Sequence, residues 1–283
     1  MKYRLIEHRT KKFTAKYLQS IYVLTNGIHE EKYGCVLNGE IGIAIVLNGE
    51  GEIDVGGKWE RQPKISVYGL VKQVQFHKMS PNYYEVNIGF NPHYLQLFLK
   101  DNISGLFERS ATDLYFLLKK NGVDKLYDHL SKCTTDEDIH TTIEEFLKTH
   151  LLYEEVDKRI LAAHDLICHK NIFNVEDLSK TLNISSAGLR NLFREKVGIT
   201  PKELMKIQRI KKSIGIQNLN DESLTQLAYR LGYFDQAHFI HDFKEAIGLL
   251  PKQYFANQQL TFDFYNYGRW SYDSFTALKH IIK

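Results

Sequence analysis

One face of a predicted helix near the C-terminal end carries an unusual set of side chains. The surrounding segment reads GYFDQAHFIHDFKEAIGLLPKQYF. Its apolar residues Phe239, Phe243 and Ile247 recur every four positions, the spacing of a helix face that packs against a core. The other face lacks the Lys and Glu residues of an ordinary solvated surface. It combines an amide, methyl groups and an imidazole, on Gln236, Ala237, Ile240 and His241.

A second predicted helix, closer to the middle of the chain, carries a comparable face. Its residues are Ser186, Ala187, Arg190 and Asn191. Arg can form two hydrogen bonds with guanine, Asn and Gln can do the same with adenine, and Ala or Ile can contact the thymine methyl group. The eight side chains therefore predict direct reading of DNA bases. The alternative is a pair of surface faces of ordinary composition.

The two faces belong to an internal repeat. Leu178 and Leu182 match Leu227 and Leu231 at an offset of 49 residues. At an offset of 50, four further positions match: Leu189, Phe193, Gly198 and Pro201 with Phe239, Phe243, Gly248 and Pro251. We expect the one-residue slip to lie in a turn, where an insertion costs least.

Each repeat predicts two helices joined by a tight turn. The first helices are expected over residues 175–182 and 224–231. Asn174 and Ser223 are suitable N-terminal caps for them, and Asn183 and Gly232 tolerate the left-handed backbone that a tight turn needs. Two helices that cross at such a turn, with the second one exposed, can enter the DNA major groove.

A further predicted helix, over residues 201–217, connects the two repeats. If it is rigid, it places the two exposed helices roughly one DNA turn apart, about 34 Å. Side chains expected to contact phosphate groups are Ser185, Lys202, Lys206, Arg209, Lys211, Lys212, Lys244 and Lys252. Arg209 has the alternative of a structural role within the repeat.

Residues from about Leu161 to Phe255 resemble the AraC/XylS family of bacterial transcription regulators. The segment LAYRLGYFDQAHFIHDFKEAIGLLPKQYF has the family's Leu-Ala, Gly-Tyr, Phe-Lys, Gly and Pro at the expected spacing. The first repeat departs at Leu204, where an aromatic residue is usual, and at Gly188, expected to be exposed and to loosen its helix by about 1 kcal/mol relative to Ala. The resemblance implies double-stranded DNA and RNA polymerase as partners.

The N-terminal half predicts a small antiparallel barrel or sandwich. Short β-branched runs between residues 20 and 90 are separated by turn signals such as Gly56-Gly57. Helices are expected from about residue 93, including 113–120, 124–130 and 136–152. The fold class is therefore α+β, with an N-terminal domain over 1–153, a helical DNA-binding domain over 154–256 and a tail over 257–283.

This N-terminal half also resembles, less specifically, the β-rich domain that precedes the DNA-binding module in some family members. The resemblance implies that it binds a small effector or pairs two protomers as a homodimer, and the residues leave both alternatives open.

The tail carries seven aromatic residues from Phe262 to Phe275. They are expected to pack on the barrel or the second repeat, or to form a dimer contact. A regulator that acts mainly through protein contacts, with weak DNA binding, is the alternative function.

Composition agrees with a nucleic-acid partner but does not establish one. The net charge is +3, and residues 155–255 carry 15 Lys and Arg against 12 Asp and Glu. Three cysteines, Cys35, Cys133 and Cys168, are far apart and odd in number, which argues against a disulfide framework or zinc site. The N-terminus lacks the apolar region of a signal peptide, so a cytoplasmic protein with no membrane association is expected.

Catalysis is not expected, and neither is a cofactor or a metal. A catalytic metal would need clustered ligands, whereas His29, His77 and His93 are widely spaced and each is expected to be a surface or core residue. No phosphate-binding glycine loop or nucleophile motif is present in the sequence.

Three aromatic residues on the predicted strands are expected to belong to the core. They are Tyr68, Phe76 and Tyr84.

Overall fold

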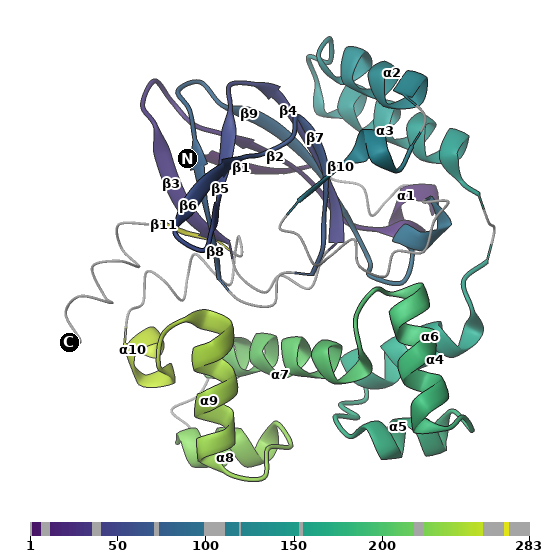
Figure 1. Ribbon diagram of the computed structural model, residues 1–283, viewed down its shortest axis with the longest axis vertical. Coiled ribbons are helices and arrows are strands. Elements are labelled where there is room, and N and C mark those ends of the chain that lie inside the picture. Colours follow the sequence, from purple (N-terminus) through teal and green to yellow (C-terminus); the bar gives the residue numbers. More distant parts are fainter. Residues whose placement is uncertain are drawn as a thin grey trace.

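The molecule has a sheet-rich N-terminal part and a helical C-terminal part (Figure 1). The computed structural model describes residues 2–6, 12–35, 41–70, 74–98, 111–118, 120–152, 155–217, 223–256 and 269–271. The predicted α+β class is confirmed, because antiparallel sheets come first and helices form most of the second half. The predicted boundary at residues 153 and 154 lies outside the described residues.

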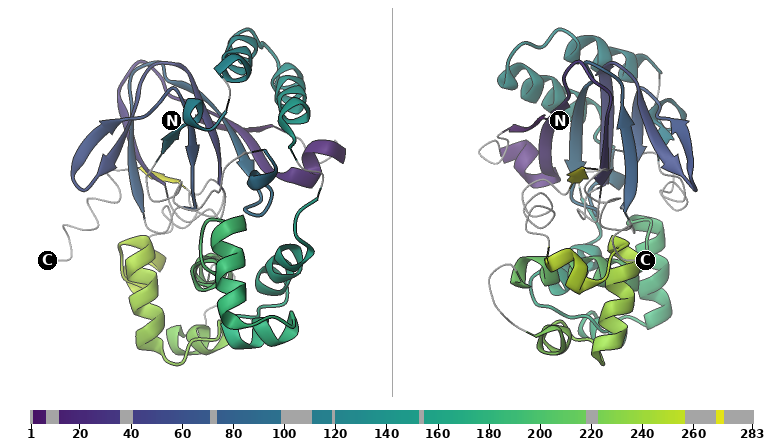
Figure 2. Two further views of the ribbon diagram at one scale, coloured as in Figure 1. Left: turned by 45° about the vertical axis from the view of Figure 1, so that its right-hand side comes forward. Right: turned by 90° about the vertical axis from the view of Figure 1, so that its left-hand side faces the viewer.

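Two antiparallel sheets form the N-terminal part, and we call this pair of sheets the barrel (Figure 2). The first sheet has, in spatial order, β1 (Lys2–Ile6), β2 (Leu18–Thr25), β9 (Tyr84–Phe90), β4 (Ile41–Asn48), β7 (Ile65–Tyr68) and β10 (Thr112–Asp113). The second has β11 (Arg269–Ser271), β3 (Glu31–Cys35), β8 (Gln75–Met79), β5 (Gly51–Val55) and β6 (Lys58–Arg61). The predicted glycine turn closes the β5–β6 hairpin, with φ of 63° at Gly56 and 90° at Gly57.

The first sheet is buried on both faces. Val86, Ile88 and Phe90 of β9 belong to the main apolar cluster, together with Val123 of α2 (Lys120–Leu130) and Ile143 of α3 (Asp136–His150). A smaller cluster between the sheets contains Leu24, Tyr33, Val46, Met79 and Tyr83. Because successive strand residues face opposite sides, the polar residues of β9 point into the space between the two sheets.

The helices of the N-terminal part differ from the prediction in one place. A helix was expected over residues 113–120, but β10 and the short 3-10 helix η3 (Leu114–Phe116) occupy the described part of this range. Asp113 pairs with Ser66 on β7, and its side chain then caps η3 by accepting the Tyr115 N–H. Helices α1 (Lys12–Tyr17) and η1 (Leu95–Leu97) complete this part.

Seven helices follow in the described C-terminal residues. They are α4 (Lys158–Cys168), α5 (Val175–Thr181), α6 (Ser186–Lys196), α7 (Pro201–Gln217), α8 (Leu224–Arg230), α9 (Gln236–Ile247) and α10 (Pro251–Phe255). We call α5 and α6 the first unit, and α8 and α9 the second unit. Asn174 caps α5 and Ser223 caps α8, the latter in a capping box with Gln226. The caps and helix positions therefore agree with the sequence prediction to within a residue or two.

The two units share the same turn. The Ile184 N–H donates to the Ser179 carbonyl in the first unit, and the Tyr233 N–H donates to the Ala228 carbonyl in the second, both at 3.0 Å. The turn residues Asn183 and Gly232 both have positive φ, 51° and 74°. These pairs keep the offset of 49 residues that the sequence repeat has.

The inserted residue of the second unit is Phe234. Ser185 caps α6 and Asp235 caps α9, at an offset of 50. The slip therefore lies between Tyr233 and Asp235, as the sequence predicted. Phe234 is 86% exposed, so the insertion bulges out of the turn without disturbing the packed helices on either side.

A short piece of the tail joins the barrel. Strand β11 pairs antiparallel with β3, with Arg269 opposite Cys35. This pairing favours the expectation that the tail packs on the barrel, at least over 269–271, while most of its aromatic residues lie outside the described residues.

Among the helices of the described residues, none has the length and hydropathy needed to cross a membrane.

Candidate nucleic-acid interface and barrel pocket

The exposed face of α6 begins directly after its cap. The Ser185 hydroxyl accepts the Gly188 N–H at 3.0 Å, so its side chain is already used to start the helix. Ser186 is half-buried, and its Oγ lies 3.1 Å from Ser179 Oγ on α5. Ala187, together with Arg190 and Asn191 one turn later, is exposed, and these three side chains form the accessible part of the predicted reading face.

The face of α9 has a similar start but different partners. Asp235 accepts the His238 N–H at 2.7 Å as the helix cap. The half-buried Gln236 accepts a hydrogen bond from the Thr225 hydroxyl at 2.7 Å, which orients its amide. Ala237 and His241 are exposed and Ile240 is half-buried. The structure thus brings all four predicted residues to one side of α9.

The two faces are presented by the same scaffold. Figure 1 and Figure 2 show α6 and α9 near opposite ends of α7, with their N-terminal ends away from the barrel. Leu204, Ile207, Ile210 and Ile214 of α7 are buried in the main apolar cluster and fix the two units relative to each other. The N-terminal halves of both helices are therefore free of the barrel, as a groove-binding pair requires.

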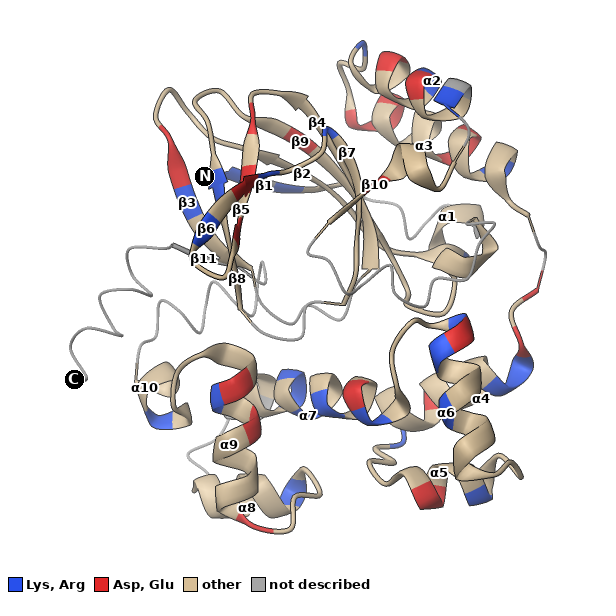
Figure 3. Ribbon diagram, in the orientation of Figure 1, with Lys and Arg blue, Asp and Glu red and all other residues tan. Residues whose placement is uncertain are grey.

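Three of the predicted phosphate-contacting lysines are available for DNA. Lys202, Lys244 and Lys252 are exposed, and within the described ranges no carboxylate pairs with them. Lys202 follows Pro201 at the start of α7, and Lys252 follows Pro251 at the start of α10. Figure 3 shows Lys and Arg residues distributed over α4, α6, α7 and α10.

The predicted phosphate contact of Arg209 is not supported, because this side chain is buried. Only 8% of it is exposed, its guanidinium lies 4.2 Å from the Tyr233 ring centre, and it pairs with Asp242 at 3.8 Å. Lys206 is also engaged, at 3.4 Å from Asp242 and 2.8 Å from Glu245. Arg209 therefore takes the structural alternative, and Lys206 can reach phosphate only by leaving two carboxylates.

The two remaining lysines of α7 lie toward α4. Lys212 Nζ donates to the Cys168 carbonyl at 2.7 Å and to the Asn171 side chain, and burial lowers its pKa. The charge of Lys211 lowers the pKa of the His164 imidazole on α4, after the larger effects of burial and of His169. Both lysines therefore contribute to the α4–α7 contact.

A group of possible metal ligands lies on α9 but is occupied by cations of the protein itself. His241, Asp242 and Glu245 place one ligand atom each within 4.8 Å of one another. Lys206 lies against both carboxylates. Together with the guanidinium of Arg209, which pairs with Asp242, it balances the two carboxylates, and these ion pairs join α7 to α9.

Gly188 is half-buried, whereas the sequence predicted an exposed position. A Cβ atom at this position would lie 3.1 Å from Ser185 Oγ, the atom that caps α6. Replacing Gly188 by Ala would therefore crowd the cap, which offsets the helix propensity that Ala contributes. The presence of a glycine here is therefore explained by the space that the Ser185 cap needs, and helix propensity is not the only factor at this position.

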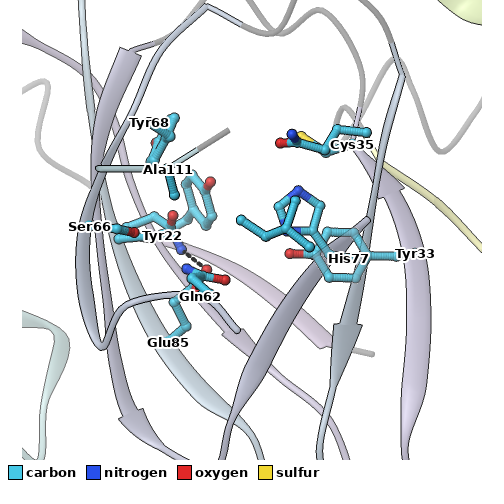
Figure 4. Close-up of a pocket in the computed structure, with 13 residues that line it drawn as sticks. Tyr22, Tyr33, Cys35, Gln62, Ser66, Tyr68, His77, Glu85 and Ala111 are labelled. Carbon is cyan, nitrogen blue, oxygen red and sulfur yellow. Dashed lines mark hydrogen bonds between the residues drawn. The ribbon is translucent and has the colours of Figure 1, made fainter. Parts of the chain in front are cut away.

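A pocket opens between the two sheets of the barrel (Figure 4). The space inside it, counted together with the open solvent at its mouth, is about 480 Å³. The residues that line it are Tyr22, Tyr33, Cys35, Ala44, Ile53, Gln62, Ser66, Tyr68, Gln75, His77, Glu85, Asn87 and Ala111. Cross-strand pairing of the first sheet places Tyr22, Asn87, Ala44 and Ser66 in one row, which explains how four distant segments meet.

A buried carboxylate lies at the pocket. Glu85 is 3% exposed and accepts hydrogen bonds from the Tyr83 hydroxyl at 2.5 Å, the Gln62 amide at 3.1 Å and the Asn87 amide at 2.6 Å. All three donors are neutral. Across the described ranges, no Lys, Arg or His forms an ion pair with Glu85, although a buried carboxylate is costly without a counter-charge.

The opposite wall comes from the second sheet. The rings of Tyr33 and His77 are stacked, with centres 5.0 Å apart and planes 12° from parallel. Ser66, on the first sheet, is fully buried, and its Oγ has no hydrogen-bond partner among the described residues. The pocket therefore combines aromatic surface with polar atoms that converge on one space.

The sequence did not identify this pocket. Tyr68 lines it, although the sequence predicted a core residue, and so does His77, whereas Phe76 and Tyr84 do pack on the apolar cluster. The available signal was the alternation in YEVNIGF, where the polar Glu85 and Asn87 alternate with apolar residues and share the other face of the strand. In the sequence this pattern is indistinguishable from a strand with one face in water.

The barrel and the helical domain meet through a pair of histidines. His93, just after β9, packs on His164 of α4 with ring centres 4.5 Å apart. Burial lowers the pKa of His93 to about 3 and that of His164 to about 4. Cys168 Sγ lies 3.4 Å from His164, and burial raises the pKa of this thiol to about 11, so it is not a reactive thiolate at neutral pH.

A second contact joins the barrel directly to α9. The Val74 N–H donates to the Ala246 carbonyl, close to the C-terminal end of α9, at 2.9 Å. Val74 precedes Gln75, which lines the pocket. One main-chain hydrogen bond, at the residue next to Gln75, therefore connects the pocket wall to the second unit.

Comparisons with known proteins agree with the helical domain described above. A family model for a helix-turn-helix domain matches residues 178–257. An HTH-type transcriptional regulator from Haemophilus influenzae is 25% identical over 117 residues, 41% of this chain and 39% of that protein. YidL from Escherichia coli, an HTH-type transcriptional regulator, is 29% identical over 103 residues, which cover 36% of this chain and 34% of YidL.

Each match to these relatives therefore spans less than half of either protein. Among solved structures, ToxT from Vibrio cholerae superposes over 83% of this chain and 97% of its own, with 14% identity and a TM-score of 0.44. The C-terminal domain of AraT from Geobacillus stearothermophilus covers 36% of this chain and 88% of its own, with 24% identity and a TM-score of 0.34.

Proposed function

We propose that this chain, whose C-terminal domain is a helix-turn-helix domain of the AraC type, is a transcription regulator that binds specific sequences in double-stranded DNA. The observation that carries the proposal is the pair of matched units on α7, each with a polar helix face directed away from the barrel. Two such faces on one rigid helix suit two successive major-groove segments, about 34 Å apart.

The two units divide the reading of bases unequally. In the first unit, Arg190 and Asn191 are exposed and have the chemistry for guanine and adenine, with Ala187 beside them for close approach. In the second unit, Gln236 and His241 supply the polar groups, and Ala237 and Ile240 supply apolar contact. Ser186 faces α5 and contributes less, since its hydroxyl lies against Ser179.

Phosphate contacts fix the register of the units on DNA. Lys202, Lys244 and Lys252 are the exposed lysines suited to this role. Lys206 joins them only if DNA displaces its carboxylate partners. Ser185 and Lys211 stay secondary candidates, because the first caps α6 and the second lies toward α4.

Selection of bound sequences from a random duplex pool tests the proposal. The purified full chain is used at one fixed salt concentration, and affinity for the selected sequence is compared with that for scrambled DNA. We expect a gapped motif whose two halves are centred about ten base pairs apart. A motif with one half would assign reading to a single unit, and no enrichment would contradict sequence-specific binding.

We further propose that the barrel pocket binds a small effector that changes the affinity for DNA. The support is the route from Gln75 in the pocket wall, through Val74, to the Ala246 carbonyl of α9. A ligand that shifts β8 would shift this contact and bias the position of the second unit, since a ligand acts through its different affinity for two states.

Removal of the Val74 N–H tests this route. A Val74→Pro variant lacks the donor to Ala246, while Val74→Ala keeps it and serves as the matched control. We expect Val74→Pro to change DNA affinity by a few-fold, in keeping with one lost hydrogen bond of about 1 kcal/mol, and Val74→Ala to leave it unchanged. Equal DNA affinities for both variants would contradict the route through Val74.

Contact with RNA polymerase and self-association stay predictions from the family resemblance. One observation favours the alternative function through protein partners. Phe234 is 86% and Tyr229 62% exposed, so the second unit presents aromatic surface next to α9. A Phe234→Ser variant that keeps DNA affinity and loses transcriptional activity in a reporter assay would support that alternative.

A further inference from the structure

The pocket in the barrel has the charge of a site for a cation. Glu85 is buried, its three hydrogen-bond donors are neutral, and no ion pair neutralises it within the described residues. Neither Lys nor Arg occurs among the described residues that line the space. Apart from His77, the described lining offers an anionic ligand no basic side chain, and such a ligand would meet the Glu85 carboxylate, so organic acids and phosphates are disfavoured.

The walls provide the second feature of such a site. Tyr22 and Tyr68 line the pocket from the first sheet, and Tyr33 lines it from the second, stacked on His77 (Figure 4). The face of an aromatic ring carries negative charge density and attracts an ammonium group, most strongly where water is excluded. A carboxylate surrounded by aromatic rings is therefore selective for organic cations over neutral molecules of the same shape.

A third feature separates amines that have N–H groups from quaternary ones. Ser66 Oγ is fully buried at the pocket and has no hydrogen-bond partner in the part of the chain that the structure describes. A buried hydroxyl without a partner costs free energy that a ligand can recover. A protonated amine can donate an N–H to such a hydroxyl or to the Glu85 carboxylate, whereas a quaternary ammonium can donate to neither.

We propose that the barrel pocket binds a small protonated amine, with its ammonium group at Glu85 and its carbon skeleton among the tyrosine rings, in the pocket that Ser66 also lines. The proposal rests on effector control as the function of the barrel, and it names the chemical class of that effector. Benzylamine, which joins one ammonium group to one aromatic ring, matches the Glu85 carboxylate and the tyrosine lining and serves as the probe.

Matched ligands test the charge of the occupant. Benzylamine, benzyl alcohol and benzoate have the same ring and differ in charge, and propylamine with propanol repeats the comparison without the ring. Thermal unfolding and calorimetric titration of the full chain measure binding at pH 7. We expect the amines to raise the unfolding temperature and the alcohols and benzoate to leave it unchanged. Equal stabilisation by an alcohol, stronger stabilisation by benzoate, or none by either amine at millimolar concentration would overturn the proposal.

Variants of the two polar groups assign the site. Glu85→Gln is expected to weaken benzylamine binding by about tenfold to a hundredfold, the range for a lost hydrogen bond to a charged group. Glu145→Gln, an exposed residue of α3, is the matched control and should not change it. Because Glu85→Gln can also destabilise the barrel, Ser66→Ala provides an independent test. We expect Ser66→Ala to weaken the affinity for benzylamine several-fold and to leave the response to benzyl alcohol unchanged. Unchanged affinity for benzylamine in both variants would overturn the site.

DNA affinity measured in the same samples separates this proposal from effector control. Amine binding with no change in affinity for the selected sequence would keep the amine site and overturn effector control. Tight binding of a neutral or anionic molecule that does change DNA affinity would keep effector control and overturn the amine.

Discussion

The two helix-turn-helix units have matching folds, but their recognition helices differ in charge. In the first unit, Arg190 and Arg194 of α6 are exposed, and no carboxylate of the described residues pairs with them. In the second unit, His241 of α9 lies 3.8 Å from Asp242 and 3.9 Å from Glu245. A repeat thus preserves the helices while the exposed residues diverge. We infer that the first unit contributes more of the electrostatic attraction to DNA.

The units also differ in how they are attached to the barrel. The first unit is reached through α4, whose His164 packs on His93 of the barrel. The second is attached directly, through the hydrogen bond from Val74 to Ala246 of α9. A change in the barrel can therefore act on the two units separately, through side-chain packing in one case and a main-chain hydrogen bond in the other.

The largest expected effect concerns the histidine contact at the first unit. The pKa of His93 is about 3 and that of His164 about 4 in the folded chain, against 6.5 for an ordinary His. Below pH 6.5 the unfolded chain binds more protons than the folded one, so stability falls as the pH falls toward 4. Since one pKa unit corresponds to about 1.4 kcal/mol and each histidine contributes about two units over this range, we expect a loss of about 6 kcal/mol for the two together.

Urea unfolding at pH 7.5 and pH 4.5 measures this loss. A His93→Phe variant keeps a ring at the contact and cannot be protonated, so its pH dependence should be clearly smaller. His29→Gln, which removes an exposed histidine of the barrel, is the control and should unfold like the parent chain. If the free energy of unfolding of His93→Phe depended on pH as strongly as that of the parent chain, protonation of His93 would not be a cause of the loss.

Arg209→Leu is expected to have the next largest effect, on the second unit. The variant leaves the Asp242 carboxylate buried, and Lys206 is then the Lys or Arg side chain that still pairs with it. It also removes the guanidinium group that lies over the Tyr233 ring. We expect the free energy of unfolding to fall by about 2–3 kcal/mol, somewhat less than for a fully broken buried pair. Lys202→Ala should change it by less than about 0.5 kcal/mol.

This pair of variants also tests the assignment of Arg209. If Arg209 contacted phosphate instead, its loss would leave stability unchanged and would reduce the salt dependence of DNA binding as Lys202→Ala does. Circular dichroism during urea unfolding, together with DNA affinity at two salt concentrations, distinguishes the two roles.

Arg190→Ala and Gln236→Ala compare base reading in the two units. Each removes one predicted pair of hydrogen bonds to a base, worth about 1–3 kcal/mol of discrimination. We expect the larger loss for Arg190→Ala, because its guanidinium is charged and exposed, whereas Gln236 already bonds to Thr225. Affinities for the selected sequence and for single-base variants check this, and a loss that is uniform over all sequences would contradict base reading.

Lys252→Ala should have the smallest effect. Its side chain is exposed and can contact phosphate, so we expect a loss of less than about 1 kcal/mol that is similar on every sequence. The slope of log affinity against log salt should become shallower by about 1. Lys58→Ala, on the exposed β5–β6 hairpin, is the matched control. A loss confined to one sequence would turn Lys252 into a reader of bases.

The repeated helical units can be predicted from the order of the amino acids, because the interactions that define them are local. The caps at Asn174 and Ser223 and the turns at Asn183 and Gly232 depend on residues only a few positions apart. The one-residue insertion was visible for the same reason, since two apolar patterns on either side of Phe234 keep their own spacing.

Which polar residues are accessible depends on how the helices and sheets pack together. Arg209 belongs to a helix rich in Lys and Arg, and only the packing of α7 against α9 and Tyr233 shows that it is buried. Glu85 lies on a strand whose alternation predicts two faces and cannot say which one meets water. Because the second sheet covers that face, a carboxylate that would be ordinary on a surface becomes part of the lining of a pocket.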